Sequence, residues 1–415
     1  SDHNTTEKYY FSVDEKIPKP KLIRKREKGI IYSINSWNNN FYMHTNKDAE
    51  DFKILKSRNI ISDQWEDFIR AKNETLIGSL IFLNNWIIRT ELTNALDKVF
   101  IRNIQTNQEE ELIFTDEKVY DPSVSLRQKD RDTNEIYISY STPKTQNRTY
   151  LYNIKTKEKK LVKEQIIPSG HEPEDYIVER LECRSHDGRI VPITITRHKE
   201  TPVDGSAELL LYGYGSYGHS MSPTFSSTRL SLINRKIIWA TAHIRGGMER
   251  GMKWWKEGKL LNKKNTFKDY ISCAEHLIKN KYTYKGGLAF YGGSAGGTTG
   301  GSVINMNPEL FFAALLLVPY VDCLTTALND KLPLTPGEYE VFGNPKKYKE
   351  YFEYIRSYSP YNNLRKTNYP PMLVTSSIFD NRVLYSEPTK YIAKLRDLKT
   401  DNNVQLLKCK LEAAG

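Results

Sequence analysis

The stretch 288–297, Leu-Ala-Phe-Tyr-Gly-Gly-Ser-Ala-Gly-Gly, constrains the fold of this chain more than any other. Gly292, Ser294 and Gly296 form a G-x-S-x-G pattern, in which a strand turns sharply into a helix and pushes the serine hydroxyl outward. Ser294 is therefore a candidate nucleophile, and the N–H of Ala295 is a candidate donor to an oxyanion. A Gly-rich helix start that holds a phosphate fits the same pattern.

The composition restricts the partners of the chain. The formal net charge of +11 comes largely from lysines scattered along the sequence, which favours a solvated basic surface over a nucleic-acid interface. The start lacks a signal-peptide pattern, and the apolar run 310–318 is too short to span a membrane. Reduced thiols fit the widely spaced cysteines better than disulfides or a zinc site, so we expect a cytoplasmic protein without bound metal. These cysteines are Cys183, Cys273, Cys323 and Cys409.

Residues 1–170 are strand-like and repetitive. Three sets of β-rich segments recur at intervals of roughly 45–50 residues, which is typical of β-propeller blades; an ordinary β-sandwich is the alternative. The chain starts inside a strand-like run (8–13), and about three blades do not close a ring. We therefore expect a partial β-propeller that lacks earlier blades. The repeated segments are 40–45, 85–90 and 135–140; 51–55, 98–103 and 149–153; and 65–69, 110–114 and 159–163.

Residues 171–415 change to an alternation of buried strands and amphipathic helices. The turn-rich stretch 166–173 marks the boundary. Segments 208–212, 236–243 and 371–376 read as strands, and 265–280 reads as a helix with apolar residues at 3–4 spacing. This alternation predicts a doubly wound, mainly parallel sheet, with the functional site at the carboxyl ends of the strands. Ser294 follows one of those ends.

A serine nucleophile needs a base, and the base needs a carboxylate that orients it. In this fold the chain order is Ser, then Asp or Glu, then His. Asp380 fits the second role because it follows a predicted strand by a short loop, although such residues are often only turn or cap residues. All eight histidines precede Ser294, and the sequence stops at Gly415, shortly after the predicted strand 404–408.

Three further groups are candidates for binding. The Gly-rich turn 212–218 carries tyrosine hydroxyls that suit a second oxyanion donor, or is a plain aromatic turn. Glu338 and Glu340 are suited to a cationic substrate group, especially a guanidinium, or belong to a solvated acidic loop. Arg382 either holds a substrate carbonyl or pairs with a carboxylate.

Together these segments resemble the prolyl oligopeptidase family of serine peptidases. The likeness runs over nearly the whole chain and is far more specific than a single serine motif. It is strongest in six stretches: 211–218, 243–247, 258–267, 292–297, 333–340 and 357–361.

The resemblance implies a propeller that caps an α/β-hydrolase domain and keeps folded proteins out. It implies Ser294 as nucleophile, Asp380 as triad carboxylate, and the Tyr214 hydroxyl and Ala295 N–H as oxyanion donors. Glu338 and Glu340 match a pair that receives the P1 Arg or Lys side chain, and Arg382 matches a contact with the substrate backbone. The implied activity is endopeptidase cleavage of short peptides after basic residues, with no cofactor.

Departures from the family pattern lead to further expectations. Family members are longer at both ends, and their histidine loop would start near Gly415, so we expect a chain truncated at both ends and inactive alone. Ser222 and Thr224 stand where acidic residues can serve a second basic subsite, which puts a preference for paired basic residues in doubt. A non-catalytic remnant of a split gene and a general esterase are the alternatives. The sequence does not predict the oligomeric state.

Overall fold

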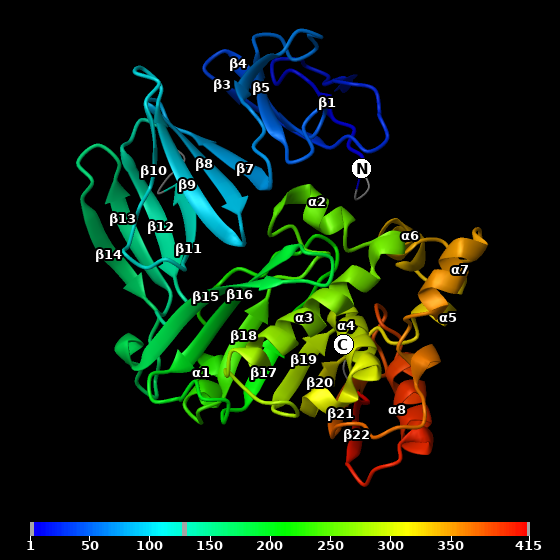
Figure 1. Cartoon of the computed structure of the whole chain (residues 1–415). Coiled ribbons are helices and arrows are strands. Elements are labelled where there is room, and N and C mark those ends of the chain that lie inside the picture. The colour runs from blue at the N-terminus through cyan, green and yellow to red at the C-terminus, as the bar shows by residue number, and fades with distance from the viewer. Residues whose placement is uncertain (1–3, 127–130, 413–415) are drawn as a thin grey trace.

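The computed structural model describes residues 4–126 and 131–412 of the chain (Figure 1). The N-terminal part consists of antiparallel sheets, and the C-terminal part is a mixed sheet flanked by helices. The predicted boundary near residue 170 lies between the last strand of the former, which ends at Glu164, and the first strand of the latter, which begins at Tyr176.

Three four-stranded sheets, each paired antiparallel, make up the N-terminal part. A two-stranded ribbon of β1 (Tyr9–Tyr10) and β2 (Lys21–Leu22) precedes them. Blade-like sheets were predicted from the repeats, and this architecture confirms them. The strands are β3 (Tyr32–Trp37), β4 (Asn40–Thr45), β5 (Lys53–Ser57), β6 (Glu66–Ile69); β7 (Thr75–Phe82), β8 (Trp86–Thr93), β9 (Leu96–Asn103), β10 (Glu109–Glu111); and β11 (Asp121–Leu126), β12 (Glu135–Ser141), β13 (Arg148–Asn153), β14 (Lys159–Glu164).

Apolar side chains pack between neighbouring sheets of this part. On β12, Ile136, Ile138 and Tyr140 alternate with more exposed residues, because successive side chains of a strand point to opposite faces. They join a cluster that also takes Ile88 and Ile101 from the preceding sheet. The sheets are thus held to one another by their faces, as in a propeller.

The C-terminal part is built on one eight-stranded sheet of order β15-β16-β18-β17-β19-β20-β21-β22. β15 and β16 form an antiparallel hairpin that pairs antiparallel with β18, and the neighbours from β18 to β22 are parallel. The predicted mainly parallel sheet is confirmed. The strands are β15 (Tyr176–Arg184), β16 (Ile190–His198), β17 (Leu209–Tyr212), β18 (Ile238–Ala242), β19 (Leu288–Gly293), β20 (Phe311–Leu317), β21 (Met372–Ser377) and β22 (Gln405–Lys410).

Helices connect these parallel strands. The longest helix, α3, buries Phe267, Tyr270 and Leu277 at helical spacing against the sheet. Among the described residues, no helix is long and apolar enough to cross a bilayer. The helices are α1 (Ser227–Ile233), α2 (Gly251–Lys256), α3 (Lys264–Lys279), α4 (Ala295–Met306), α5 (Cys323–Leu328), α6 (Thr335–Phe342), α7 (Lys349–Arg356) and α8 (Ser386–Leu398).

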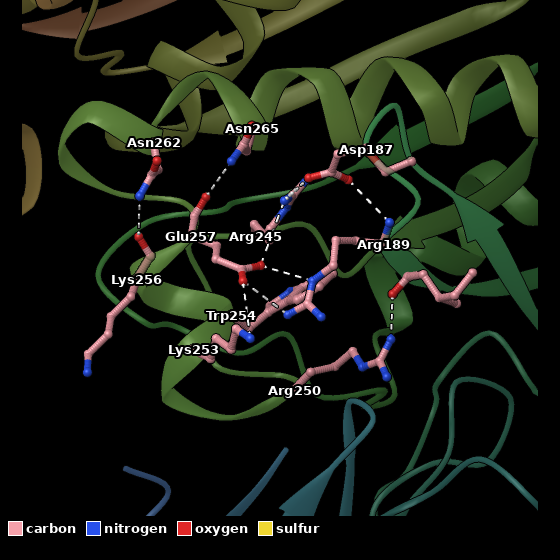
Figure 2. A network of polar contacts seen from close by, with 12 residues as sticks. Asp187, Arg189, Arg245, Arg250, Lys253, Trp254, Lys256, Glu257, Asn262 and Asn265 are labelled. Atoms are coloured by element: carbon pink, nitrogen blue, oxygen red, sulfur yellow. Dashed lines mark hydrogen bonds and ion pairs between the residues drawn. The ribbon is translucent and has the colours of Figure 1, made fainter. Parts of the chain in front are cut away.

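A buried ion pair anchors the segment between β18 and α3. Arg245 is 1% exposed, and its Nε and Nη2 donate to the two carboxylate oxygens of Asp269 at 2.8 and 2.6 Å. The backbone N–H of Arg245 also donates to Asp269, at 3.1 Å. Figure 2 shows Asp187 and Glu257 at the same guanidinium, which also lies 5.7 Å from the ring centre of Trp254.

The outer side of this segment contacts the N-terminal sheets. The Met252 N–H donates to Asp51 at 2.7 Å, and Lys256 pairs with Glu50 at 2.7 Å. Two contacts reach the second sheet: Arg250 pairs with Glu74, and the Ala95 N–H, at the tip of the β8–β9 hairpin, donates to the Glu249 carbonyl at 2.8 Å. Residues 245–257 therefore join the two parts of the molecule.

Two carboxyl groups meet near a second contact between the parts. The carboxyl groups of Asp97 and Asp121 lie close enough to influence each other, and the Ser222 hydroxyl donates to Asp97 at 3.3 Å. Burial, with the nearby charge of Asp121, raises the pKa of Asp97 to about 6.

Replacing Asp269 with Ala is expected to lower the free energy of unfolding by ~3–5 kcal/mol, because the Arg245 guanidinium is then buried without its main partner. Urea unfolding followed by tryptophan fluorescence measures the change. Asp397→Ala, on the exposed side of α8, is the matched control and should change stability by less than ~0.5 kcal/mol. Equal midpoints for the two variants would contradict the anchoring role.

Asp97→Asn is expected to change the pH dependence of stability. A raised pKa means that the folded protein binds more protons than the unfolded chain between pH about 4 and about 6, so wild-type stability falls as pH rises through that window. The variant should therefore gain stability relative to wild type from pH 4 to pH 7, as measured by thermal melts. The exposed Asp63→Asn serves as control, and parallel pH profiles for Asp97→Asn and wild type would refute the assignment.

Candidate active site

Ser294 lies in a strained backbone conformation between β19 and α4. Its φ of 52° and ψ of −127° fall in a region that residues with a side chain rarely adopt. Its N–H donates to the Leu317 carbonyl at 3.0 Å, and its carbonyl accepts from Gly297 and Tyr320 at 2.8 and 2.9 Å. These hydrogen bonds hold the strained turn that the G-x-S-x-G pattern predicts.

The glycines around the serine permit close approach of neighbouring backbone. A Cβ on Gly297 would lie 2.2 Å from the Cβ of Pro319, and one on Gly293 would lie 3.0 Å from the Leu317 carbonyl oxygen. Both contacts come from the segment that starts in β20. Small residues at these positions therefore let the turn sit against the next strand.

Tyr214 lies beside Ser294 on the loop 213–218, which follows β17. The two hydroxyls lie close enough for Ser294 to influence the pKa of Tyr214. Burial raises that pKa above its usual value, so the phenol stays protonated and able to donate. The Thr299 hydroxyl of α4 donates to the Tyr214 carbonyl at 3.0 Å and ties this loop to the helix. Ala295, the first residue of α4, is fully buried. The two predicted oxyanion donors thus come from two different elements, the loop 213–218 and the start of α4.

Asp380 lies in the loop after β21 and is 8% exposed. Its Oδ1 accepts the backbone N–H groups of Arg382 and Val383 at 2.9 and 3.0 Å, which fixes the carboxylate in a tight turn. β21 is separated from β19 only by β20, and all three strands are parallel. Ser294 and Asp380 consequently follow strand ends on the same edge of the sheet.

A cavity of about 800 Å³ opens in front of Ser294. Arg382, from the Asp380 loop, lines it. Of the described residues that line the cavity, Glu338 is the one carboxylate and His219 the one histidine. The His219 ring lies 5.7 Å from that of Tyr214. The site therefore combines a serine, a tyrosine donor, a cation and an anion.

The side chains of Glu338 and Glu340 line two different cavities. Both lie on α6, where residues two apart are about 200° apart around the axis. Glu338 accepts from the Tyr217 hydroxyl at 2.9 Å and lines the Ser294 cavity. Glu340 accepts from the Asn4 side chain at 2.7 Å and lines a different cavity, of about 900 Å³. The structure does not bring the predicted carboxylate pair together.

Two residues of the site were not predicted from the sequence. Tyr217 holds Glu338, and its pKa is raised far above normal by burial and by the neighbouring carboxylate. Lys263 lies fully buried beneath the loop 213–218. Both residues stand in stretches that the sequence analysis singled out, Tyr217 in 212–218 and Lys263 in 258–267. Nothing in the sequence indicates which tyrosine or lysine of these stretches faces inward.

Within residues 4–126 and 131–412, no group of three or more His, Cys, Asp or Glu side chains is arranged to hold a metal ion.

Two family models match the chain. The model of the prolyl oligopeptidase family matches residues 223–412, and the model of the N-terminal β-propeller domain of prolyl oligopeptidase matches residues 1–165. Together they cover most of the sequence, and the division between them agrees with the two parts of the structure.

Known relatives and solved structures show the same likeness. Dipeptidyl aminopeptidase BI of Pseudoxanthomonas mexicana is 37% identical over 94% of this chain and 54% of its own length, and protease 2 of Moraxella lacunata is 35% identical over 100% and 59%. Oligopeptidase B of Trypanosoma brucei superposes with a TM-score of 0.93 at 34% identity, and that of Leishmania major with 0.92 at 32%. These matches cover 100% of this chain and 60% and 59% of the two structures.

The chain therefore spans little more than half the length of these relatives. The hydrolase sheet and the blade-like sheets agree with the two matched family models, and the superposed structures share this fold. The chain belongs to the prolyl oligopeptidase family of serine peptidases and resembles oligopeptidase B within it.

Proposed function

We propose that this chain carries the site of a serine endopeptidase that cleaves short peptides after Arg or Lys. The observation that carries the proposal is the strained Ser294 at the mouth of a cavity whose lining includes the carboxylate of Glu338. The relatives named protease 2 and oligopeptidase B support a peptidase rather than a general esterase.

In the proposed reaction, Ser294 Oγ attacks the carbonyl carbon of the scissile bond and its proton passes to a base. The Tyr214 hydroxyl and the Ala295 N–H would donate to the oxyanion of the tetrahedral intermediate. The base then protonates the leaving amine, and water hydrolyses the acyl-enzyme by the same route. Asp380 would orient the base, a histidine that the family pattern places after it and that the printed sequence does not contain.

Selectivity for basic residues would come mainly from Glu338. Its carboxylate offers a charge partner for a guanidinium or an ammonium group, and the hydrogen bond from Tyr217 orients it. Arg382, which lines the same cavity, is suited to donate to a carbonyl of the substrate backbone. We assign Glu340 a smaller part, because it lines the other cavity.

The propeller would restrict access to short peptides, as the resemblance implies. The protein would act in the cytoplasm, since the four cysteines are free and reduced thiols persist there. Short basic peptides are the expected substrates.

Glu338→Gln is expected to weaken the binding of benzamidine, which mimics a basic P1 side chain, by roughly 10- to 100-fold, because a charge-assisted hydrogen bond contributes about 1.5–3 kcal/mol. Isothermal titration calorimetry on the 415-residue chain measures this. Glu340→Gln, on the same helix, is the matched control and should change the affinity by less than about twofold. Equal losses for the two variants, or none, would remove Glu338 from the proposed P1 site.

The 415-residue chain is expected to hydrolyse N-benzoyl-arginine ethyl ester no faster than its Ser294→Ala variant, because residues 381–415 contain no histidine that could serve as the proposed base. Removing a triad member leaves only roughly 10³–10⁴-fold catalysis over water. Rapid hydrolysis that depends on Ser294 would contradict the assignment of the base.

The intact mass of the native protein in its source cell complements that assay. A mass well above 48.2 kDa, with a peptide that continues Ala414-Gly415 into a histidine, would support an active peptidase. A mass near 48.2 kDa would favour the alternative that the chain is a non-catalytic remnant of a split gene.

A further inference from the structure

We propose that Lys263 is a positioning residue of the active site, whose buried amino group holds the loop 213–218 so that Tyr214 faces Ser294 and Tyr217 faces Glu338. This inference rests on the proposed function for its consequence in catalysis. The hydrogen bonds from which it starts do not depend on that function.

The amino group of Lys263 contacts the loop directly. Its Nζ donates to the Gly215 carbonyl at 2.5 Å and to the Ser216 hydroxyl at 2.9 Å. A third, longer contact of 3.4 Å reaches the Thr266 hydroxyl. Gly215 and Ser216 separate the two functional tyrosines, so these bonds act on the middle of the loop.

Lys263 is 0% exposed and has no carboxylate within ion-pair distance among the described residues. Burial lowers its pKa to about 7. A charged or neutral amine can donate to the Gly215 carbonyl, because either form carries N–H groups. Since lysine is almost never fully buried without a partner, its presence at this loop requires an explanation beyond solubility or surface charge.

The loop needs support because part of it is strained. Tyr217 has a φ of 59°, which is unfavourable for an aromatic residue. Such conformations are unfavourable and persist only where the surroundings fix them. The Lys263 hydrogen bonds fix Gly215 and Ser216, the two residues that precede Tyr217. The residue after it is fixed by the Gly218 N–H, which donates to the Gly246 carbonyl at 2.8 Å.

Lys263 also reaches the helix that carries Glu338. Its Nζ lies 5.7 Å from the ring centre of Phe342 on α6, and that ring packs edge-on against Tyr217 at 6.1 Å. Tyr217 in turn donates to Glu338 at 2.9 Å. One amino group therefore lies against both the loop and α6, at the point where they meet.

The experiment compares wild type, Lys263→Met, Ser216→Ala and the double variant in the 415-residue chain. Methionine keeps an unbranched apolar stem and removes the donor. Hydrogen exchange measured by mass spectrometry follows the segment 209–221, calorimetry gives the affinity for benzamidine, and thermal melts give global stability. Lys264→Met is the matched control, since the neighbouring amine makes no hydrogen bond among the described residues.

Lys263→Met should speed exchange in 209–221 at least about tenfold and weaken benzamidine binding by a similar factor, with other segments little changed. The effects of Lys263→Met and Ser216→Ala on exchange should be non-additive in the double variant. Once Lys263→Met has removed the donor, the loss of the Ser216 acceptor breaks no further hydrogen bond with it. A packing role alone would give additive effects, or a loss of protection throughout the hydrolase part, and would overturn the proposal.

Misfolding of Lys263→Met and a failure of wild type to bind benzamidine each have a defined consequence for the proposal. Should Lys263→Met not fold, Ser216→Ala alone must still raise exchange in 209–221, and unchanged exchange there overturns the proposal. Should wild type not bind benzamidine, the proposed P1 site fails, while the exchange measurement still decides the role of Lys263.

Discussion

The buried pair of Arg245 and Asp269 anchors the segment through which the two parts of the structure meet. It fixes the start of the segment that leads from β18 to α3, and this segment carries the contacts of Met252 and Lys256 with the propeller part. The Arg245 carbonyl also accepts a hydrogen bond from the Thr266 hydroxyl at 2.8 Å. This bond places Arg245 beside Lys263. Charges buried this deeply destabilise a fold unless each is paired, and here three donors of Arg245 meet one carboxylate.

The active site is assembled from strained parts held by such rigid neighbours. Ser294 and Tyr217 both have positive φ values, and each is surrounded by hydrogen bonds that leave the local backbone little freedom. Strain of this kind is typical of functional sites, where an exposed nucleophile or a precisely aimed donor requires a conformation that the chain alone would not adopt. The Ser294 turn is held by the backbone of β20 and its following loop, and the Tyr217 loop by the Lys263 side chain and by the backbone bond from Gly218 to Gly246.

Much of the fold was predictable because it follows from short-range patterns. The repeats predicted blade-like sheets, and the alternation of apolar strands with amphipathic segments predicted the parallel sheet. Helix α6 was not predicted, because the pair Pro336-Gly337 is also typical of turns and the stretch around it read as a loop. As a result Glu338 and Glu340, which look equivalent in the sequence, lie on different sides of one helix.

The sequence by itself determined the family, the serine turn and the alternation of the main strands with helices, since these depend on residue type and local spacing. Only the tertiary structure decided which carboxylate lines the cavity of Ser294, which tyrosine supports it, and that Lys263 lies buried beneath the loop between them. Those choices depend on the helical rotation of α6 and on contacts between residues about 50 to 120 positions apart, and no local pattern encodes such pairings.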